Sequence, residues 1–193
     1  NQTDRLTSLV NNILGPNKKP SFELQNIHAP LENVLDLLQQ DLSESGIDLI
    51  KDYDPSIPEI SIDIYLLEQS VLNLVKNAKE SLEEGEVFSP EIRIVTRVLR
   101  QEFLGQTQHK TVCSISVTDN GPGIPKDLKD SIFFPMISSK ATGSGLGLSI
   151  TQGIISQHNG IIKCKSEPGK TEFSILIPIK HQVHDQELRR ANA

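Results

Sequence analysis

The chain has 193 residues, 36% of them hydrophobic and 23% charged, which is typical of a globular protein with one large domain or one domain and a small appendage. The formal net charge of −6 does not favour nucleic-acid binding. No apolar run reaches the roughly 18 residues that span a bilayer, and no signal-peptide pattern opens the sequence. We therefore expect neither a nucleic-acid nor a membrane partner.

The two cysteines, Cys113 and Cys164, each lie within a strand-like run. Two cysteines at this spacing make neither a disulfide framework nor a metal site. We expect free thiols in or near the core, a reducing compartment and a cytoplasmic location.

The first 15 residues carry apolar side chains at helical spacing and are interpreted as the C-terminal end of a longer helix. Gly15 and Pro16 stop this helix, and residues 16–21 are predicted to be a linker. A single domain is expected over residues 22–180. The polar tail, residues 181–193, is expected to be disordered.

Within the domain, apolar periodicity predicts three helices, over residues 29–42, from the N-cap Asp63 to about Leu82, and from Gly147 to His158. Strand-like runs cover residues 22–27, 47–54, 91–99, 111–119, 161–167 and 171–179. The polar residues 100–110 are predicted to form a hairpin loop. This order favours an α+β fold: a two-layer α/β sandwich with a mixed, largely antiparallel sheet and helices on one face.

Two asparagines, Asn73 and Asn77, lie one turn apart on the longest predicted helix. Asparagine is a poor helix former, so two of them in mid-helix are costly unless their amides are used. They are either solvent-facing side chains or oxygen ligands for a hard cation such as Mg²⁺ or its water shell. The residues alone leave both interpretations open.

Side-chain alternation places Asp119 on the same buried side of its strand as Ile115 and Val117. A buried carboxylate is expensive without a partner. The following stretch, "NGPG", bends sharply and leaves room at Gly121 and Gly123. Asp119 either caps this turn or accepts a hydrogen bond from the exocyclic amine of a flat ring.

Three alternate glycines, Gly143, Gly145 and Gly147, precede the last predicted helix. Unpaired N–H groups at a helix start, approached through glycines, make an anion site. The preceding "PMISSKAT" is not a strand, so the dinucleotide-binding fingerprint does not fit.

Taken in this order, the motifs resemble the N, G1, F and G2 boxes of the Bergerat (GHKL) ATP-binding fold. Within that superfamily the chain resembles the catalytic domain of sensor histidine kinases of the nitrogen-regulation type, from about residue 3 to residue 180. The resemblance is carried by "KDYDPSIPEI", "NLVKNAKESL", "DNGPGIP", "FFPMISSKATGSGLGLSI" and "PGKTEFSILIPI". It implies the cofactors ATP and Mg²⁺.

The resemblance implies that Asn77 holds the magnesium, that Asn73 lies near the phosphates, and that Lys140 balances their charge. It also implies that Asp119 accepts a hydrogen bond from the adenine amino group and that Gly123 lets the ring lie close. The other nucleotide-binding positions that it implies are Gly121, Ile124, Gly143, Ser144, Gly145, Leu146, Gly147, Leu148 and Thr171.

By the same resemblance, residues 126–146 form the ATP lid, with a hydrophobic anchor at Phe133, Phe134, Pro135 and Met136. Relatives that hydrolyse ATP carry a glutamate one turn before the magnesium asparagine. Here that position holds Asn73, which cannot accept a proton at neutral pH. The resemblance therefore implies transfer of the γ-phosphoryl group to a histidine, not to water.

The acceptor histidine of the family lies on a dimerisation domain, of which residues 1–15 resemble only the end. The five histidines of this chain lie outside any such motif and are expected at the surface: His28, His109, His158, His181 and His184. The partners implied are the chain's own dimerisation domain in a homodimer, an NtrC-like response regulator and, by analogy, a PII-like signal protein.

Two alternatives remain open. The first is a GHKL-fold ATPase or an anti-sigma-type serine kinase, against which Asn73 argues. The second is a non-catalytic nucleotide-sensing module, against which the complete N, G1 and G2 boxes argue.

Overall fold

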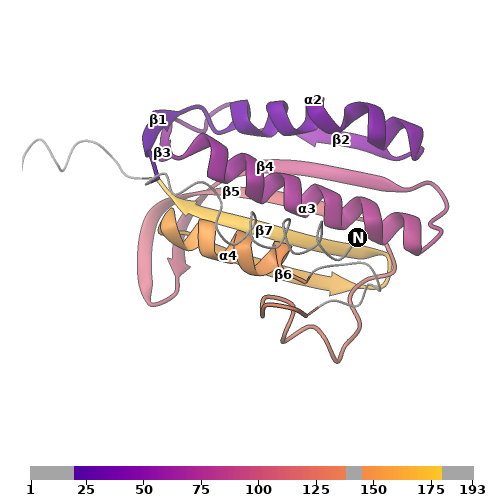
Figure 1. Cartoon of the computed structure of the whole chain (residues 1–193). Helices are drawn as coiled ribbons and strands as arrows, with labels where there is room; N and C mark the ends of the chain where they lie inside the picture. Colours follow the sequence, from indigo (N-terminus) through magenta and orange to yellow (C-terminus); the bar gives the residue numbers. More distant parts are fainter. Residues whose placement is uncertain (1–19, 138–144, 180–193) are drawn as a thin grey trace, which may run out of the picture.

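The computed structural model describes residues 20–137 and 145–179 (Figure 1). The predicted helix end and most of the predicted linker, the polar tail, and the site candidates Lys140, Gly143 and Ser144 lie outside these ranges.

Three helices are described: α2 (His28–Glu44), α3 (Ile64–Glu84) and α4 (Gly147–Gln157). The strands are β1 (Glu23–Gln25), β2 (Asp48–Asp52), β3 (Ile60–Ile62), β4 (Glu91–Leu104), β5 (Thr107–Asp119), β6 (Ile161–Glu167) and β7 (Lys170–Pro178). The helix positions agree with the sequence prediction to within two residues at each end.

The main sheet has the strand order β2-β4-β5-β7-β6. The β2–β4 pair is parallel, and the other three pairs are antiparallel. Figure 1 shows the three helices on one face of this sheet, while β1 and β3 form a separate antiparallel pair beside it. The predicted α+β sandwich is confirmed.

Helix α3 is held in place by its apolar stripe and by its N-cap. Its buried side chains are Leu67, Ser70, Val71, Leu74, Val75, Ala78 and Leu82. They face inward-pointing strand residues such as Ile94 and Ile115, each fully buried. Burial of each large apolar side chain contributes about 1.5–3 kcal/mol. The Asp63 carboxylate accepts a hydrogen bond from the Leu66 N–H at 3.1 Å, as the sequence predicted for the cap.

The segment 100–110, predicted to be a loop, is mostly strand. Strands β4 and β5 run on to Leu104 and Thr107, which pair in register. Gly105 begins the two-residue turn with φ +63°, the positive value that hairpin turns prefer. The prediction was wrong because it relied on apolar alternation, which marks strands that pack on a core. In this hairpin the two strands are held by backbone hydrogen bonds to each other, which need no such pattern.

His158 is buried, with 3% of its surface exposed, although the sequence predicted a surface residue. Its Nε2 atom accepts a hydrogen bond from the Asp63 backbone N–H at 3.1 Å. A backbone N–H can only donate, so Nδ1 carries the ring proton and donates it to the Ile154 carbonyl at 2.9 Å. The second oxygen of Asp63 accepts from the Ser21 N–H at 2.8 Å. The end of α4 and the incoming chain are thus both fastened to the start of α3.

Both cysteines are free thiols, with Cys113 buried and Cys164 half-buried. Burial raises the pKa of Cys113 to about 12 and that of Cys164 to about 11, so neither is reactive at neutral pH. Within the described residues, no helix is long and apolar enough to cross a membrane.

Candidate nucleotide-binding site

One face of α3 brings the separate sequence motifs together. Asn73, Asn77 and Ser81 follow one another at intervals of four residues and so lie along one face. The Asn73 amide donates to the Gly147 carbonyl at 3.3 Å, at the start of α4. Two turns further on, Ser81 lies at Gly121: a Cβ built on this glycine would be 2.9 Å from Ser81 Oγ. Asn77 therefore lies between the start of α4 and the end of β5.

Asp119 points to the inner, helix-covered side of the sheet, as alternation predicted, and is 4% exposed. Its Oδ1 atom accepts a hydrogen bond from the Gly121 N–H at 2.9 Å. It pairs in register with Thr171 on β7, which is also 4% exposed. The Thr171 hydroxyl lies 3.0 Å from that of Ser166. The structure thus brings Asp119, Gly121 and Thr171 together at one end of the sheet.

The turn after β5 is fastened to the β6–β7 hairpin. The Gly121 carbonyl accepts from the Gly169 N–H at 2.9 Å, and the Ile124 N–H donates to Ser166 Oγ at 2.8 Å. Gly123 has φ +86°, and a Cβ on it would lie 2.8 Å from the Glu167 carbonyl oxygen. The packing of the chain itself therefore requires a glycine at position 123, before any ligand is considered.

The start of α4 differs from the start of α3 in having no side-chain N-cap among the described residues. Leu146, the N-cap residue, is 5% exposed, and among the described residues none caps this end with a side-chain hydrogen bond. A Cβ on Gly147 would meet its nearest described atom, Asn73 Cγ, at 3.8 Å, which is an ordinary contact. The N–H groups and the dipole of a helix start favour an anion, so the start of α4 is a candidate phosphate position.

Residues 62–181 match the family described as "Histidine kinase-, DNA gyrase B-, and HSP90-like ATPase". The chain belongs to this ATPase family. It is 44% identical over 178 residues to the sensory histidine kinase/phosphatase NtrB of Vibrio alginolyticus, and 42% identical over 180 residues to NtrB of Klebsiella oxytoca. These alignments cover 92% and 93% of the chain, which spans about half the length of the curated relatives it matches.

Solved structures agree with this assignment. The catalytic domain of histidine kinase ThkA superposes with a TM-score of 0.68 at 28% identity, over 82% of this chain and 95% of that one. Full-length ShkA in complex with AMPPNP gives 0.72 at 26% identity, over 91% of this chain and 36% of that one. The predicted resemblance to nitrogen-regulation sensor kinases is confirmed, and the fold is that of a histidine kinase catalytic domain.

The segment predicted to be the ATP lid, residues 126–146, is described at both of its ends. The Met136 N–H donates to the Gly145 carbonyl at 3.0 Å, so residues 136 and 145 meet. Gly145 has φ +67°, and a Cβ there would lie 2.7 Å from the Met136 backbone. Of the predicted hydrophobic anchor, Phe133 packs on Phe173 with ring centroids 6.4 Å apart, whereas Phe134, Pro135 and Met136 are exposed. The anchor is thus narrower than predicted.

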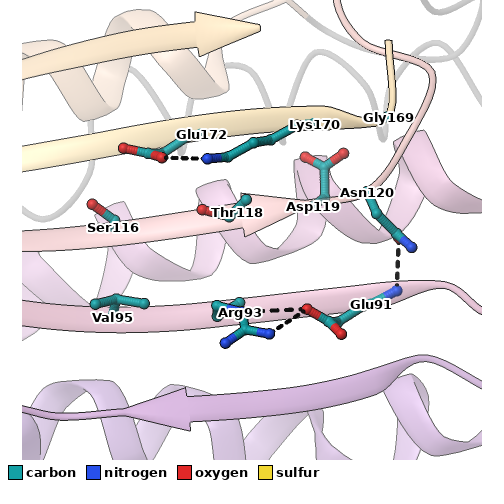
Figure 2. Close-up of a pocket in the computed structure, with 10 residues that line it drawn as sticks. All are labelled: Glu91, Arg93, Val95, Ser116, Thr118, Asp119, Asn120, Gly169, Lys170 and Glu172. Atoms are coloured by element: carbon teal, nitrogen blue, oxygen red, sulfur yellow. Dashed lines mark hydrogen bonds and ion pairs between the residues drawn. The ribbon is translucent and has the colours of Figure 1, made fainter. Parts of the chain in front are cut away.

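A hollow lies elsewhere in the domain. Figure 2 shows it on the outer face of the sheet, away from the helices, with a volume of about 440 Å³. Four of its charged residues form ion pairs within their own strands: Arg93 with Glu91 at 3.1 Å, and Lys170 with Glu172 at 3.4 Å. The hollow reaches Asp119 and Asn120 at the strand end, but neither Asn73, Asn77 nor α4 lines it.

Sequence reasoning missed three polar residues around the site. Ser81 could have been found, because it continues the four-residue spacing of Asn73 and Asn77. Ser166 and Thr151 carry no sequence signal, since their importance comes from contacts with residues distant in the chain.

Proposed function

We propose that the chain is the catalytic part of an NtrB-like sensor histidine kinase and transfers the γ-phosphoryl group of ATP to a histidine on the protein's own dimerisation domain. The NtrB names of its relatives support this reaction. The two alternatives, an ATPase or serine kinase and a non-catalytic nucleotide sensor, are separate outcomes of the experiment below.

In this proposal, Asp119 accepts a hydrogen bond from the adenine amino group, beside Thr171, Gly121 and Ile124. The N–H groups at Leu146, Gly147 and Leu148 face the phosphates, together with the lid residues Lys140, Gly143, Ser144 and Gly145. Asn77 is the protein ligand of Mg²⁺, which neutralises phosphate charge when bound. Within residues 20–137 and 145–179 there is no cluster of three or more acidic, histidine or cysteine side chains that could hold a metal. In this proposal, water and phosphate oxygens would supply the other ligands of the Mg²⁺.

The observation that carries the kinase reaction is the amide at position 73. Its nitrogen donates to the start of α4, and an amide cannot take a proton from water at neutral pH. Position 73 therefore offers no base that could activate water. Transfer to a stronger nucleophile such as histidine does not need this base, because positioning and charge neutralisation dominate phosphoryl transfer.

The wider assignments also belong to this proposal. Residues 1–15 end a helix of the dimerisation domain, residues 16–21 form the linker, residues 22–180 the catalytic domain, and residues 181–193 a polar tail. The full protein works as a cytoplasmic homodimer with an NtrC-like response regulator and a PII-like signal protein. The structure of ThkA in complex with the response regulator protein TrrA, 26% identical with a TM-score of 0.69, supports a regulator partner.

A phosphotransfer assay tests the reaction. The chain is incubated with radioactive Mg-ATP, alone and with a separately purified NtrB dimerisation fragment. We expect label on the fragment and none on the chain alone. Asn77→Ala should abolish transfer, whereas Lys76→Ala, an exposed neighbour on α3, should leave it unchanged. Label on the chain alone, steady ATP hydrolysis, or ATP binding without transfer would each contradict the proposal.

A further inference from the structure

Thr151 lies on α4 one turn after Gly147, and its side chain is completely buried. Its hydroxyl donates to the Gly147 carbonyl at 2.9 Å. Because its single proton is used there, the oxygen is left to accept, and it receives a hydrogen bond from the Asn73 amide at 3.4 Å. A buried hydroxyl is costly unless it is paired in this way.

The same Asn73 nitrogen also donates to the Gly147 carbonyl, at 3.3 Å. Asn73, Thr151 and Gly147 therefore form a closed triangle of hydrogen bonds between the middle of α3 and the first turn of α4. An amide suits position 73, because its nitrogen donates to both oxygens in the arrangement seen, whereas an ionised carboxylate would bring no proton.

The triangle lies at the start of α4. At the other end, His158 is tied to Asp63 by a buried bond of 3.1 Å. At the start, no side-chain cap is seen among the described residues, and the hydrogen bonds of the triangle join this turn to α3.

We infer that Thr151 is a positioning residue for the phosphate end of the site. Together with Asn73, it holds the first turn of α4 so that its N–H groups meet the phosphates in the correct place. This inference rests on the proposed nucleotide site, but Thr151 itself contacts no phosphate. It acts through Asn73 and the Gly147 carbonyl.

Thr151→Val tests the inference, because valine keeps the shape of the side chain and removes the hydroxyl. Thr151→Ser is the matched control, because it keeps the hydroxyl and removes the methyl group. We expect Thr151→Val to weaken Mg-ATP binding about fivefold to tenfold, the usual effect of one lost hydrogen bond, and Thr151→Ser to bind almost as the wild type does.

Adenosine provides the second readout, because it has no phosphates and engages only the Asp119 end. Its affinity should be the same in the wild type and in Thr151→Val. In a double-mutant cycle, Thr151→Val should have little further effect once Asn73→Ala has removed the amide, since the two side chains act together.

The inference is overturned if Thr151→Val binds Mg-ATP like the wild type, if the serine and valine variants lose affinity equally, if adenosine loses as much as Mg-ATP, or if the Asn73 and Thr151 effects simply add. A wild-type chain that binds no Mg-ATP would instead overturn the proposed function itself.

Discussion

The two faces of the five-stranded sheet carry polar side chains in very different surroundings. On the inner face, under the helices, Asp119 and Thr171 are each 4% exposed, and each has a hydrogen-bond partner. On the outer face, Arg93 and Lys170 line an open hollow and pair with acidic side chains two residues away on their own strands (Figure 2).

This difference explains why we expect the nucleotide site on the inner face and not at the outer hollow. The outer charges are satisfied locally and in contact with water, where ion pairs contribute little to stability. The inner polar groups depend on partners from other parts of the chain. Replacing one of these side chains with an apolar one leaves its buried partner without a hydrogen bond. Chemistry that requires fixed donors and acceptors therefore belongs on the inner face.

The largest expected effect tests the packing of the two faces. Ile115 is fully buried on the inner face, and the next residue, Ser116, points outward. Ile115→Ala should lower the free energy of unfolding by about 2–5 kcal/mol, because it removes buried methyl groups and leaves a cavity. Ser116→Ala loses a 3.0 Å contact with Ser174 and should cost at most about 1 kcal/mol. Urea denaturation measures both, and equal losses would contradict the comparison.

The second prediction tests the inner face as the binding face. Asp119→Asn keeps one oxygen for the Gly121 N–H and replaces the other with a donor, which would face the adenine amino group. We expect Mg-ATP binding to weaken by about 10–100-fold, measured by calorimetry.

Thr118→Val is the matched control for Asp119→Asn, because Thr118 precedes Asp119 and lines the outer hollow. It should bind Mg-ATP like the wild type. If Thr118→Val weakened binding and Asp119→Asn did not, the outer hollow would be the nucleotide site.

Local sequence patterns predicted the parts of the fold that depend on local physics. The periodicity of α3, its cap at Asp63 and the inward direction of Asp119 all follow from spacing along one element, and all are confirmed. Strand β3 was missed because its three residues are too few for a pattern and are fixed by pairing with β1.

Apart from the local hairpin at residues 100–110, what the sequence did not reveal concerns contacts between residues far apart in the chain. His158 looked like a surface residue at a helix end, but its partner Asp63 lies 95 positions earlier. Thr151 carries no sequence signal, because its partner Asn73 lies on another helix. The nucleotide-binding roles of the site residues remain predictions, since they depend on a ligand as well as on the fold.

The smallest expected effect concerns His28, at the α2 edge of the inner face. Its Nε2 atom lies 3.0 Å from the hydroxyl of Thr96, a fully buried residue of β4, and its ring stacks on Tyr53 at 4.8 Å. Burial lowers the pKa of His28 below the ordinary 6.5, although the nearby carboxylates of Asp54 and Glu32 oppose this shift.

The folded chain therefore takes up this proton less readily than the unfolded chain. The contribution of neutral His28 to the free energy of unfolding is complete above pH 6.5. It is lost as the pH falls below 6.5 toward the lowered pKa. The urea midpoint of the wild type should fall between pH 7.5 and pH 5.5. The midpoint of His28→Gln should fall less, because glutamine can still bond to Thr96 but does not titrate. Because the other histidines are common to both proteins, an equal loss would show that His28 is not its source.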